Sequence, residues 1–207
     1  SLKMINTEKI ADSLTNYIVK NKVIKKEESE IYKYGFWTGI EMLIYIVTCC
    51  CIAAQMDMFQ ECIVFFLAFF SLRSFVGGIH MSNYTKCFVC SCIVFILILL
   101  AVDNLQLTDI WAMSISIFEL LLIFFMNPVE NINRPVDKNE KKVFAHRKKQ
   151  ILAIILGTVI FLFMKGYNSY LNTITYTLGI IIISMLLGKI KMAENYERMT
   201  ERESSFD

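Results

Sequence analysis

Residues 87–102 read CFVCSCIVFILILLAV, a run that contains no charged side chain. A transmembrane helix needs ~20 predominantly apolar residues to cross the ~30 Å hydrocarbon core of a bilayer. This run is apolar over most of that length. The whole chain of 207 residues is 56% hydrophobic, with a mean hydropathy of +0.50. So apolar a composition exceeds what the surface of a soluble domain tolerates. We therefore expect an all-α, polytopic membrane protein.

Similar apolar blocks recur along the chain, and charged residues mark the gaps between them. Together the blocks predict six spanning helices: Phe36–Ala54, Phe59–Val76, Cys87–Val102, Ile110–Met126, Gln150–Met164 and Leu171–Leu187. The fifth block has a short apolar run. Either Lys165, Gly166 and Tyr167 extend it at the interface, or it pairs with the sixth block as a tight hairpin.

The basic residues predict the orientation, because Lys and Arg near the ends of spans are retained on the cytoplasmic side. Of the 21 basic residues, only Lys165 falls in a connection that this arrangement places outside. The other outer connections carry acidic residues, namely Asp57, Asp103 and Asp109. We expect a multi-pass protein of a cell membrane with both termini in the cytoplasm. The net charge of +2 then belongs to a belt that flanks the membrane, so nucleic acid is not an expected partner.

A single membrane domain is expected over residues 1–207. It comprises a cytoplasmic amphipathic segment (1–34), a six-span bundle (35–188) with a cytoplasmic loop (127–149), and a cytoplasmic tail (189–207). In the first segment, apolar residues recur at three- and four-residue steps: Met4, Ile5, Ile10, Leu14, Tyr17, Ile18 and Ile24. This pattern predicts an amphipathic helix on the inner leaflet, which either covers the bundle or helps to bind a partner. Its N-terminal end is marked by Thr7, Glu8 and Asp12.

Three glutamates fall within the predicted spans, where exposure of a carboxylate to lipid is costly. Glu41 is expected near the inner surface and Glu61 near the outer one. Glu119 lies deeper and is the best candidate for a buried hydrogen bond or for a partner of Arg73.

Seven cysteines raise the question of redox or metal chemistry. Four of them lie inside apolar runs and are interpreted as small hydrophobic residues: Cys49, Cys50, Cys51 and Cys62. Cys87 and Cys90 have the C-x-x-C spacing of a dithiol, but the predicted orientation places them on the reducing side of the membrane. A second pair at zinc-ligand spacing is missing, so neither a metal nor another cofactor is expected. Cys90 and Cys92 are interpreted as residues of a helix face.

The stretch from Arg73 to Cys87, RSFVGGIHMSNYTKC, has a different character. In one straight helix, His80 and Cys87 would lie roughly 10.5 Å apart along the axis, too far for proton transfer. A bend is therefore required, and Gly77 and Gly78 can supply it by ending the second span. Residue types that begin a helix follow, namely Ser82, Asn83 and Thr85. Cys87 then falls at a helix N-terminus beside a lysine, where a thiolate is favoured, with His80 as its base.

The pattern Arg-x4-Gly-x-His-x6-Cys, formed by Arg73, Gly78, His80 and Cys87, resembles the accessory gene regulator protein B (AgrB) family. The basic amphipathic N-terminus and the short spans are similar too, so the likeness covers nearly the whole chain. Members of that family are Gram-positive membrane cysteine endopeptidases, which cut a short precursor peptide on its C-terminal side as the first step toward a cyclic quorum-sensing signal. The resemblance implies His80 and Cys87 as catalytic residues and Arg73 and Gly78 as residues that support the site.

The activity that this resemblance implies is acyl transfer at the inner membrane face. Cys87 attacks the scissile carbonyl, His80 passes the proton to the leaving amine, and part of an AgrD-like precursor stays on the enzyme as a thioester. Expected partners are that precursor, the lipid bilayer and a second copy of the chain in a homodimer. Two other interpretations stay open: a membrane thiol oxidoreductase that uses Cys87 and Cys90, and a non-enzymatic transporter or scaffold.

Overall fold

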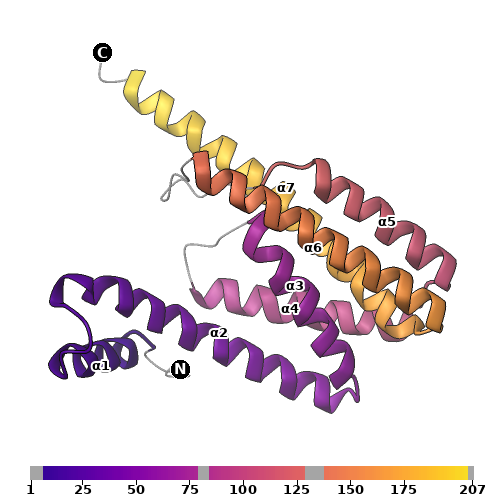
Figure 1. The fold of residues 1–207 in the computed structure, drawn as a ribbon, viewed down its shortest axis with the longest axis horizontal. Coiled ribbons are helices and arrows are strands. Elements are labelled where there is room, and N and C mark those ends of the chain that lie inside the picture. Colours follow the sequence, from indigo (N-terminus) through magenta and orange to yellow (C-terminus); the bar gives the residue numbers. More distant parts are fainter. Residues whose placement is uncertain (1–6, 79–83, 129–137, 205–207) are drawn as a thin grey trace. The chain divides into compact units, whose positions relative to one another are not determined.

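The computed structural model describes residues 7–78, 84–128 and 138–204, and over these residues the secondary structure is helical, without strands. Figure 1 shows the helices in chain order: α1 (Thr7–Lys20), the short 3-10 helix η1 (Lys26–Glu28), α2 (Ser29–Gln55), α3 (Phe59–Val76), α4 (Tyr84–Asn104), α5 (Asp109–Phe125), α6 (Lys138–Lys165) and α7 (Asn168–Ser204). The all-α prediction is confirmed.

Each predicted span coincides with one of the helices α2 to α7. Four stretches are long and apolar enough to cross a membrane: Lys26–Gln55, Phe59–Val76, Thr85–Asn104 and Asn168–Glu194. Helix α5 is shorter, with 17 residues, and α6 begins with a charged stretch, so its apolar part is short. By length and composition these helices are compatible with a membrane protein, while the count of six spans stays a prediction.

Three helices extend well past the predicted boundaries. Helix α2 begins at Ser29, within the segment expected at 1–34. Helix α6 begins at Lys138, within the loop expected at 127–149, and α7 continues to Ser204 through the charged tail. Lys, Arg and Glu are good helix formers, so a helix can continue after it leaves the apolar region. Charge therefore predicted where the apolar stretches end and did not predict where the helices end.

The chain divides into two compact units, Ser1–Ile52 and Ala53–Asp207. In the first unit, Lys33 of α2 forms ion pairs with two residues of α1, Asp12 at 2.8 Å and Glu8 at 3.6 Å. The acidic residues predicted for the start of α1 are therefore paired with the neighbouring helix. These contacts hold the N-terminal part of α1 against α2.

The apolar side of α1 is exposed within this unit. The buried positions of α1 are Thr7, Ala11 and Thr15. By contrast, Ile10 and Leu14 are each 41% exposed, and Tyr17 is 68% exposed. Trp37 of α2 contacts the buried side of α1, because its Nε1 donates a hydrogen bond to Thr7 Oγ1 at 3.1 Å. An apolar helix face left open in this way suits the interface between a membrane and water.

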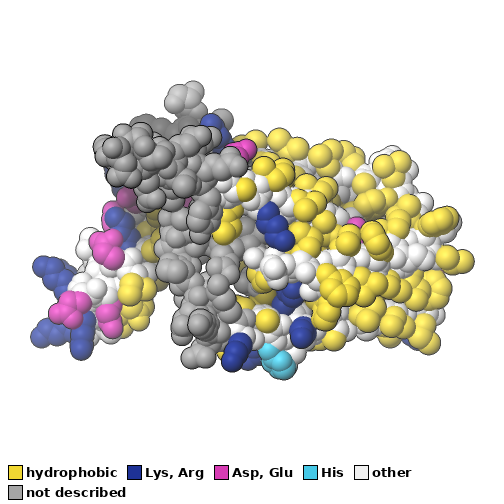
Figure 2. Space-filling view, turned by 90° about the horizontal axis from the view of Figure 1, so that it is seen from above, with side chains coloured by type: hydrophobic (Ala, Val, Ile, Leu, Met, Phe, Trp, Pro, Cys, Tyr) yellow, Lys and Arg dark blue, Asp and Glu magenta, His cyan; other side chains and the backbone are white. Residues whose placement is uncertain are grey.

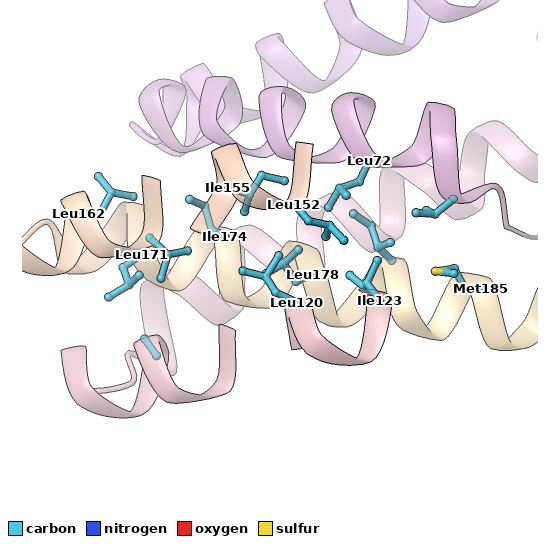
Figure 3. Packing of buried hydrophobic residues seen from close by; sticks show 14 residues of the cluster. Leu72, Leu120, Ile123, Leu152, Ile155, Leu162, Leu171, Ile174, Leu178 and Met185 are labelled. Carbon is cyan, nitrogen blue, oxygen red and sulfur yellow. The ribbon is translucent and has the colours of Figure 1, made fainter. Parts of the chain in front are cut away.

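In the second unit, α7 is the central helix and contacts α3, α4, α5 and α6. Its inward side chains join a buried apolar cluster with residues of α3, α5 and α6, drawn in Figure 3: Leu72, Leu120, Ile123, Leu152, Ile155, Leu162, Leu171, Ile174, Leu178 and Met185. On the face drawn in Figure 2, hydrophobic side chains also cover much of the outer surface. Helices that are apolar both inside and outside are expected where lipid surrounds a bundle.

A polar network joins the connection between α4 and α5 to the first turns of α7. Asn172 is fully buried; its Oδ1 accepts a hydrogen bond from Leu107 N at 3.0 Å, and its Nδ2 donates to Leu107 O at 3.2 Å. Asn168 donates to the same carbonyl at 3.1 Å and to Asp109 Oδ1 at 2.8 Å. These two asparagines supply hydrogen-bond partners that the backbone of the irregular connection does not obtain from a regular helix.

Lys148 of α6 covers the C-terminal end of α5. Its Nζ donates hydrogen bonds to the carbonyl oxygens of Ile123 at 3.2 Å, Phe124 at 3.1 Å and Met126 at 2.9 Å. The last carbonyls of a helix lack partners inside it and attract a cation. Burial, and after it the charges of neighbouring lysines, lower the pKa of Lys148.

We predict that Asn172→Leu destabilises the bundle, because the Leu107 N–H loses its acceptor while the volume at position 172 stays filled. The expected loss is about 1 kcal/mol, the size of one hydrogen bond between membrane helices. The melting temperature of the protein in detergent measures the effect. Asn104→Leu is the matched control, because Asn104 is exposed and bonds to Leu100 O in its own helix. Equal melting temperatures for the two variants would contradict the prediction.

Candidate active site at the turn between α3 and α4

The end of α3 is built by two glycines. The helix ends at Val76, and the Gly77 N–H donates to Arg73 O at 3.2 Å. Gly77 and Gly78 then have φ angles of 68° and 147°, which residues with a Cβ rarely adopt. The prediction that this glycine pair ends the second span is confirmed.

The side chain of Arg73 folds back onto this turn. Its Nη1 donates a hydrogen bond to Gly77 O, so the guanidinium lies over the backbone of the turn. A Cβ built on Gly78 would lie 1.5 Å from Arg73 Nη1 and 2.6 Å from Arg73 Cζ. Gly78 is therefore suited to its place in two ways: its backbone has a positive φ, and the space beside its Cα is filled by the guanidinium.

Cys87 lies in the first turn of α4, as the sequence predicted, and its side chain is half-buried. The free N–H groups of a helix N-terminus favour a negative charge there. Cys87 also interacts electrostatically with Arg73, which reaches it from the end of α3. The turn thus brings a thiol and a guanidinium from two consecutive helices close to one another.

The structure brings together three of the four residues predicted for the site, namely Arg73, Gly78 and Cys87. His80 falls at 79–83, outside the described residues, as do Ser82 and Asn83. The pairing of His80 with Cys87 therefore stays a prediction.

One residue that the sequence did not single out also reaches this turn. Ser184 of α7 places its Oγ 2.6 Å from the Cβ position of Gly78, on which the Arg73 guanidinium also lies. Ser184 is far from Gly78 in the sequence and occurs in an apolar run, so no motif or spacing pointed to it. Only the packing of α7 against α3 brings it to the site.

The other thiols of α4 have a different environment. Cys90 is exposed and lines an apolar hollow of about 460 Å³ along the helix, with Thr85, Lys86, Val89, Ile93 and Val94. All seven cysteines lie in the part of the chain that the structure describes, and none of them forms a disulfide. Among the described residues, no group of three or more His, Cys, Asp or Glu side chains is arranged to hold a metal ion.

Two of the glutamates in the predicted spans, Glu61 and Glu119, differ in their surroundings. Glu61 accepts a hydrogen bond from Ser169 Oγ at 2.7 Å. Glu119 lies against α7, with its Oε1 3.0 Å from the Cβ position of Gly179. Its Oε2 is buried and has no hydrogen-bond partner within the part of the chain that the structure describes. The buried hydrogen bond expected for Glu119 is thus not made by this atom.

We predict that Gly78→Ala displaces the Arg73 guanidinium and destabilises the turn. The positive φ alone costs about 1–3 kcal/mol in a residue with a Cβ, and the overlap with Arg73 adds to it. Gly166→Ala is the comparison, because Gly166 also has a positive φ, of 70°, and has open space around it. The melting temperature in detergent should fall more for Gly78→Ala than for Gly166→Ala. Equal decreases would mean that the guanidinium does not fill this space.

Comparison with known proteins identifies relatives along nearly the whole chain. Residues 11–190 match the family described as accessory gene regulator B. The chain is 25% identical over 195 residues to an AgrB-like protein of Clostridium perfringens strain SM101, a match that covers 91% of this chain and 86% of the relative.

A second relative comes from a different genus. The chain is 29% identical over 145 residues to the accessory gene regulator protein B of Staphylococcus saprophyticus, with coverage of 70% of this chain and 71% of the relative. No solved structure gives a significant match. Because the family match extends over most of the chain and includes the turn between α3 and α4, the protein belongs to the accessory gene regulator B family.

Proposed function

We propose that this protein is a membrane cysteine endopeptidase that cuts a short AgrD-like precursor peptide on its C-terminal side, so that the N-terminal product closes into a cyclic quorum-sensing peptide. The observation that carries the proposal is the place of the Arg73 guanidinium, which lies on Gly78 at the turn between α3 and α4 and interacts electrostatically with Cys87. Membership of the accessory gene regulator B family supports it.

The first half of the reaction transfers an acyl group to Cys87. The thiolate attacks the scissile carbonyl carbon, the peptide C–N bond breaks, and a thioester forms between the N-terminal part of the precursor and Sγ. His80 takes the thiol proton and delivers it to the leaving amine. The thioester keeps the acyl group activated, so the peptide-bond energy is not lost to water.

The second half closes the ring. An internal cysteine or serine of the bound precursor attacks the thioester carbonyl, and its proton passes through His80 to the departing Cys87 thiolate. A thiolactone or lactone leaves, and the enzyme returns to its starting state. The reaction as written needs no nucleotide and no oxidant.

Arg73 supports this chemistry through its charge. Its electrostatic interaction with Cys87 steadies negative charge that develops on the sulfur and at the carbonyl oxygen during the reaction. Its Nη1 is bonded to Gly77 O, which directs the guanidinium toward the turn. This geometry favours a bracing role over capture of an acidic part of the precursor.

Helix α1 supports delivery of the precursor along the membrane surface. Its exposed apolar residues can insert among the lipids, while its lysines can meet anionic headgroups on the inner leaflet. A precursor that is itself membrane-bound would approach in the same plane. A second copy of the chain is the other partner that we propose.

A thiol oxidoreductase is the second candidate function, because Cys87 and Cys90 lie one helical turn apart on α4 and Cys90 is exposed. That function requires both thiols, whereas the endopeptidase requires only Cys87. A transporter or scaffold would form no covalent adduct with a precursor. Substitution of the two cysteines therefore separates the three functions.

We predict that Cys87→Ser and His80→Ala each reduce precursor cleavage by on the order of 10³-fold or more, while membrane insertion is unchanged. A nucleophile and its base act as one unit, so the double variant should be no worse than either single one. Cleavage in membranes that contain the protein and a candidate precursor, followed by intact-mass analysis of the thioester adduct, measures the effect.

Cys90→Ser is the matched control for this experiment and should keep most of the activity, as should Cys92→Ser. Cleavage that persists in Cys87→Ala would rule out the endopeptidase mechanism. Loss of activity in Cys90→Ser as complete as that in Cys87→Ser would instead favour the dithiol function.

We predict that replacing Ile10, Leu14 and Tyr17 together by serine impairs capture and cleavage of the precursor without loss of insertion. These three side chains are exposed, whereas the contacts between α1 and α2 use other residues, so the fold of the first unit is retained. Crosslinking of a precursor and its cleavage rate are the readouts. As a control for the site itself, Cys87 of the variant should react normally with iodoacetamide. Wild-type crosslinking and cleavage would remove α1 from the mechanism.

A further inference from the structure

The surroundings of the Gly77–Gly78 turn include a side chain from a distant part of the chain. Helix α7 packs against α3, and Leu72 and Val76 of α3 are buried in the same cluster as Ile181 and Met185 of α7. Ser184 lies between these last two residues in the sequence of α7. It thereby reaches the end of α3 at the level of the turn.

The Ser184 hydroxyl and the Arg73 guanidinium meet at one point. Measured from the Cβ position of Gly78, Ser184 Oγ lies at 2.6 Å and Arg73 Nη1 at 1.5 Å, so the two side chains are close neighbours. A serine ends at its Oγ, and so leaves room for the planar guanidinium. A larger side chain at position 184 would extend into the space that the guanidinium occupies.

The place of the guanidinium matters because Arg73 interacts electrostatically with Cys87. The strength of such an interaction falls with distance, and it is greatest where little water separates the charges. Lys86, which precedes Cys87 in the sequence, lies on the same helix as the thiol. A change that moves the Arg73 guanidinium off the turn would therefore alter the charge that Cys87 experiences from α3.

We propose that Ser184 is a positioning residue of the site, whose small hydroxyl-bearing side chain seats the Arg73 guanidinium on the Gly77–Gly78 turn and thereby sets the positive charge facing Cys87. This inference rests on the proposed role of Cys87 as the nucleophile. It makes α7, which contributes none of the motif residues, a part of the site. A shift of α7 relative to α3 would then change the reactivity of the thiol.

The test is the pH dependence of Cys87 alkylation in the purified full chain in lipid nanodiscs. Iodoacetamide reacts with the thiolate. The peptide that contains Cys87 also contains Cys90 and Cys92, so fragment-ion sequencing by mass spectrometry assigns the label to Cys87. Ser184→Leu should move the midpoint of the profile upward by about one pH unit, which is about a tenfold loss of reactivity below the midpoint. Ser184→Val adds less volume and should move it in the same direction by a smaller amount.

Ser74→Leu is the matched control. Ser74 is an exposed residue next to Arg73, its hydroxyl bonds to Phe70 O in its own helix, and its substitution should leave the profile unchanged. Melting temperatures identify variants that have not folded. If Ser184→Leu does not fold, Ser184→Val decides the question. A folded Ser184 variant with the wild-type profile would overturn the inference, as would an equal shift in Ser74→Leu.

The readout separates this inference from the proposed function, because alkylation requires no precursor. An unshifted alkylation profile in the Ser184 variants, together with loss of cleavage in Cys87→Ser, would contradict the role of Ser184 and still support the endopeptidase. Cleavage that survives in Cys87→Ser would contradict the proposed endopeptidase mechanism, whatever the alkylation profile of the Ser184 variants.

Discussion

The packing of α7 against the four helices α3 to α6 organises the second unit. The face of α7 that includes Leu171, Leu178 and Met185 is fully buried, and the apolar clusters of α3, α5 and α6 close around it. In lipid, apolar burial between helices brings little hydrophobic gain, so close packing and hydrogen bonds must hold them. Hydrogen bonds are supplied along α7, for example between Thr175 and Ser116 of α5 at 2.8 Å.

The two ends of the bundle are closed by polar residues of different kinds. Asn168 and Asn172 bind the backbone of the connection between α4 and α5, and Lys148 binds the last carbonyls of α5 at the opposite end of that helix. In both places a side chain supplies a hydrogen-bond partner to backbone groups that have none within a regular helix. Basic residues near a membrane boundary therefore have a structural use besides orientation.

The candidate site lies where the regular structure is interrupted. A backbone that leaves a helix within or near a membrane must have its polar groups satisfied by other parts of the protein. Arg73 does this for the turn by donating to Gly77 O, and the same side chain interacts electrostatically with Cys87. The residue that stabilises the break thus also carries the positive charge that interacts with the proposed nucleophile.

The sequence by itself determined the all-helical fold, the position of the break at Gly77 and Gly78, and the place of Cys87 in the first turn of α4, because length, apolar runs and glycine act locally. It predicted His80 and Cys87 as a pair from the bend between them and from the family motif. Only the tertiary structure decided that α7 is central, that Lys148 covers α5, and that Ser184 reaches Arg73. The inner and outer faces of these helices are both apolar, so periodicity cannot indicate which face packs against which neighbour.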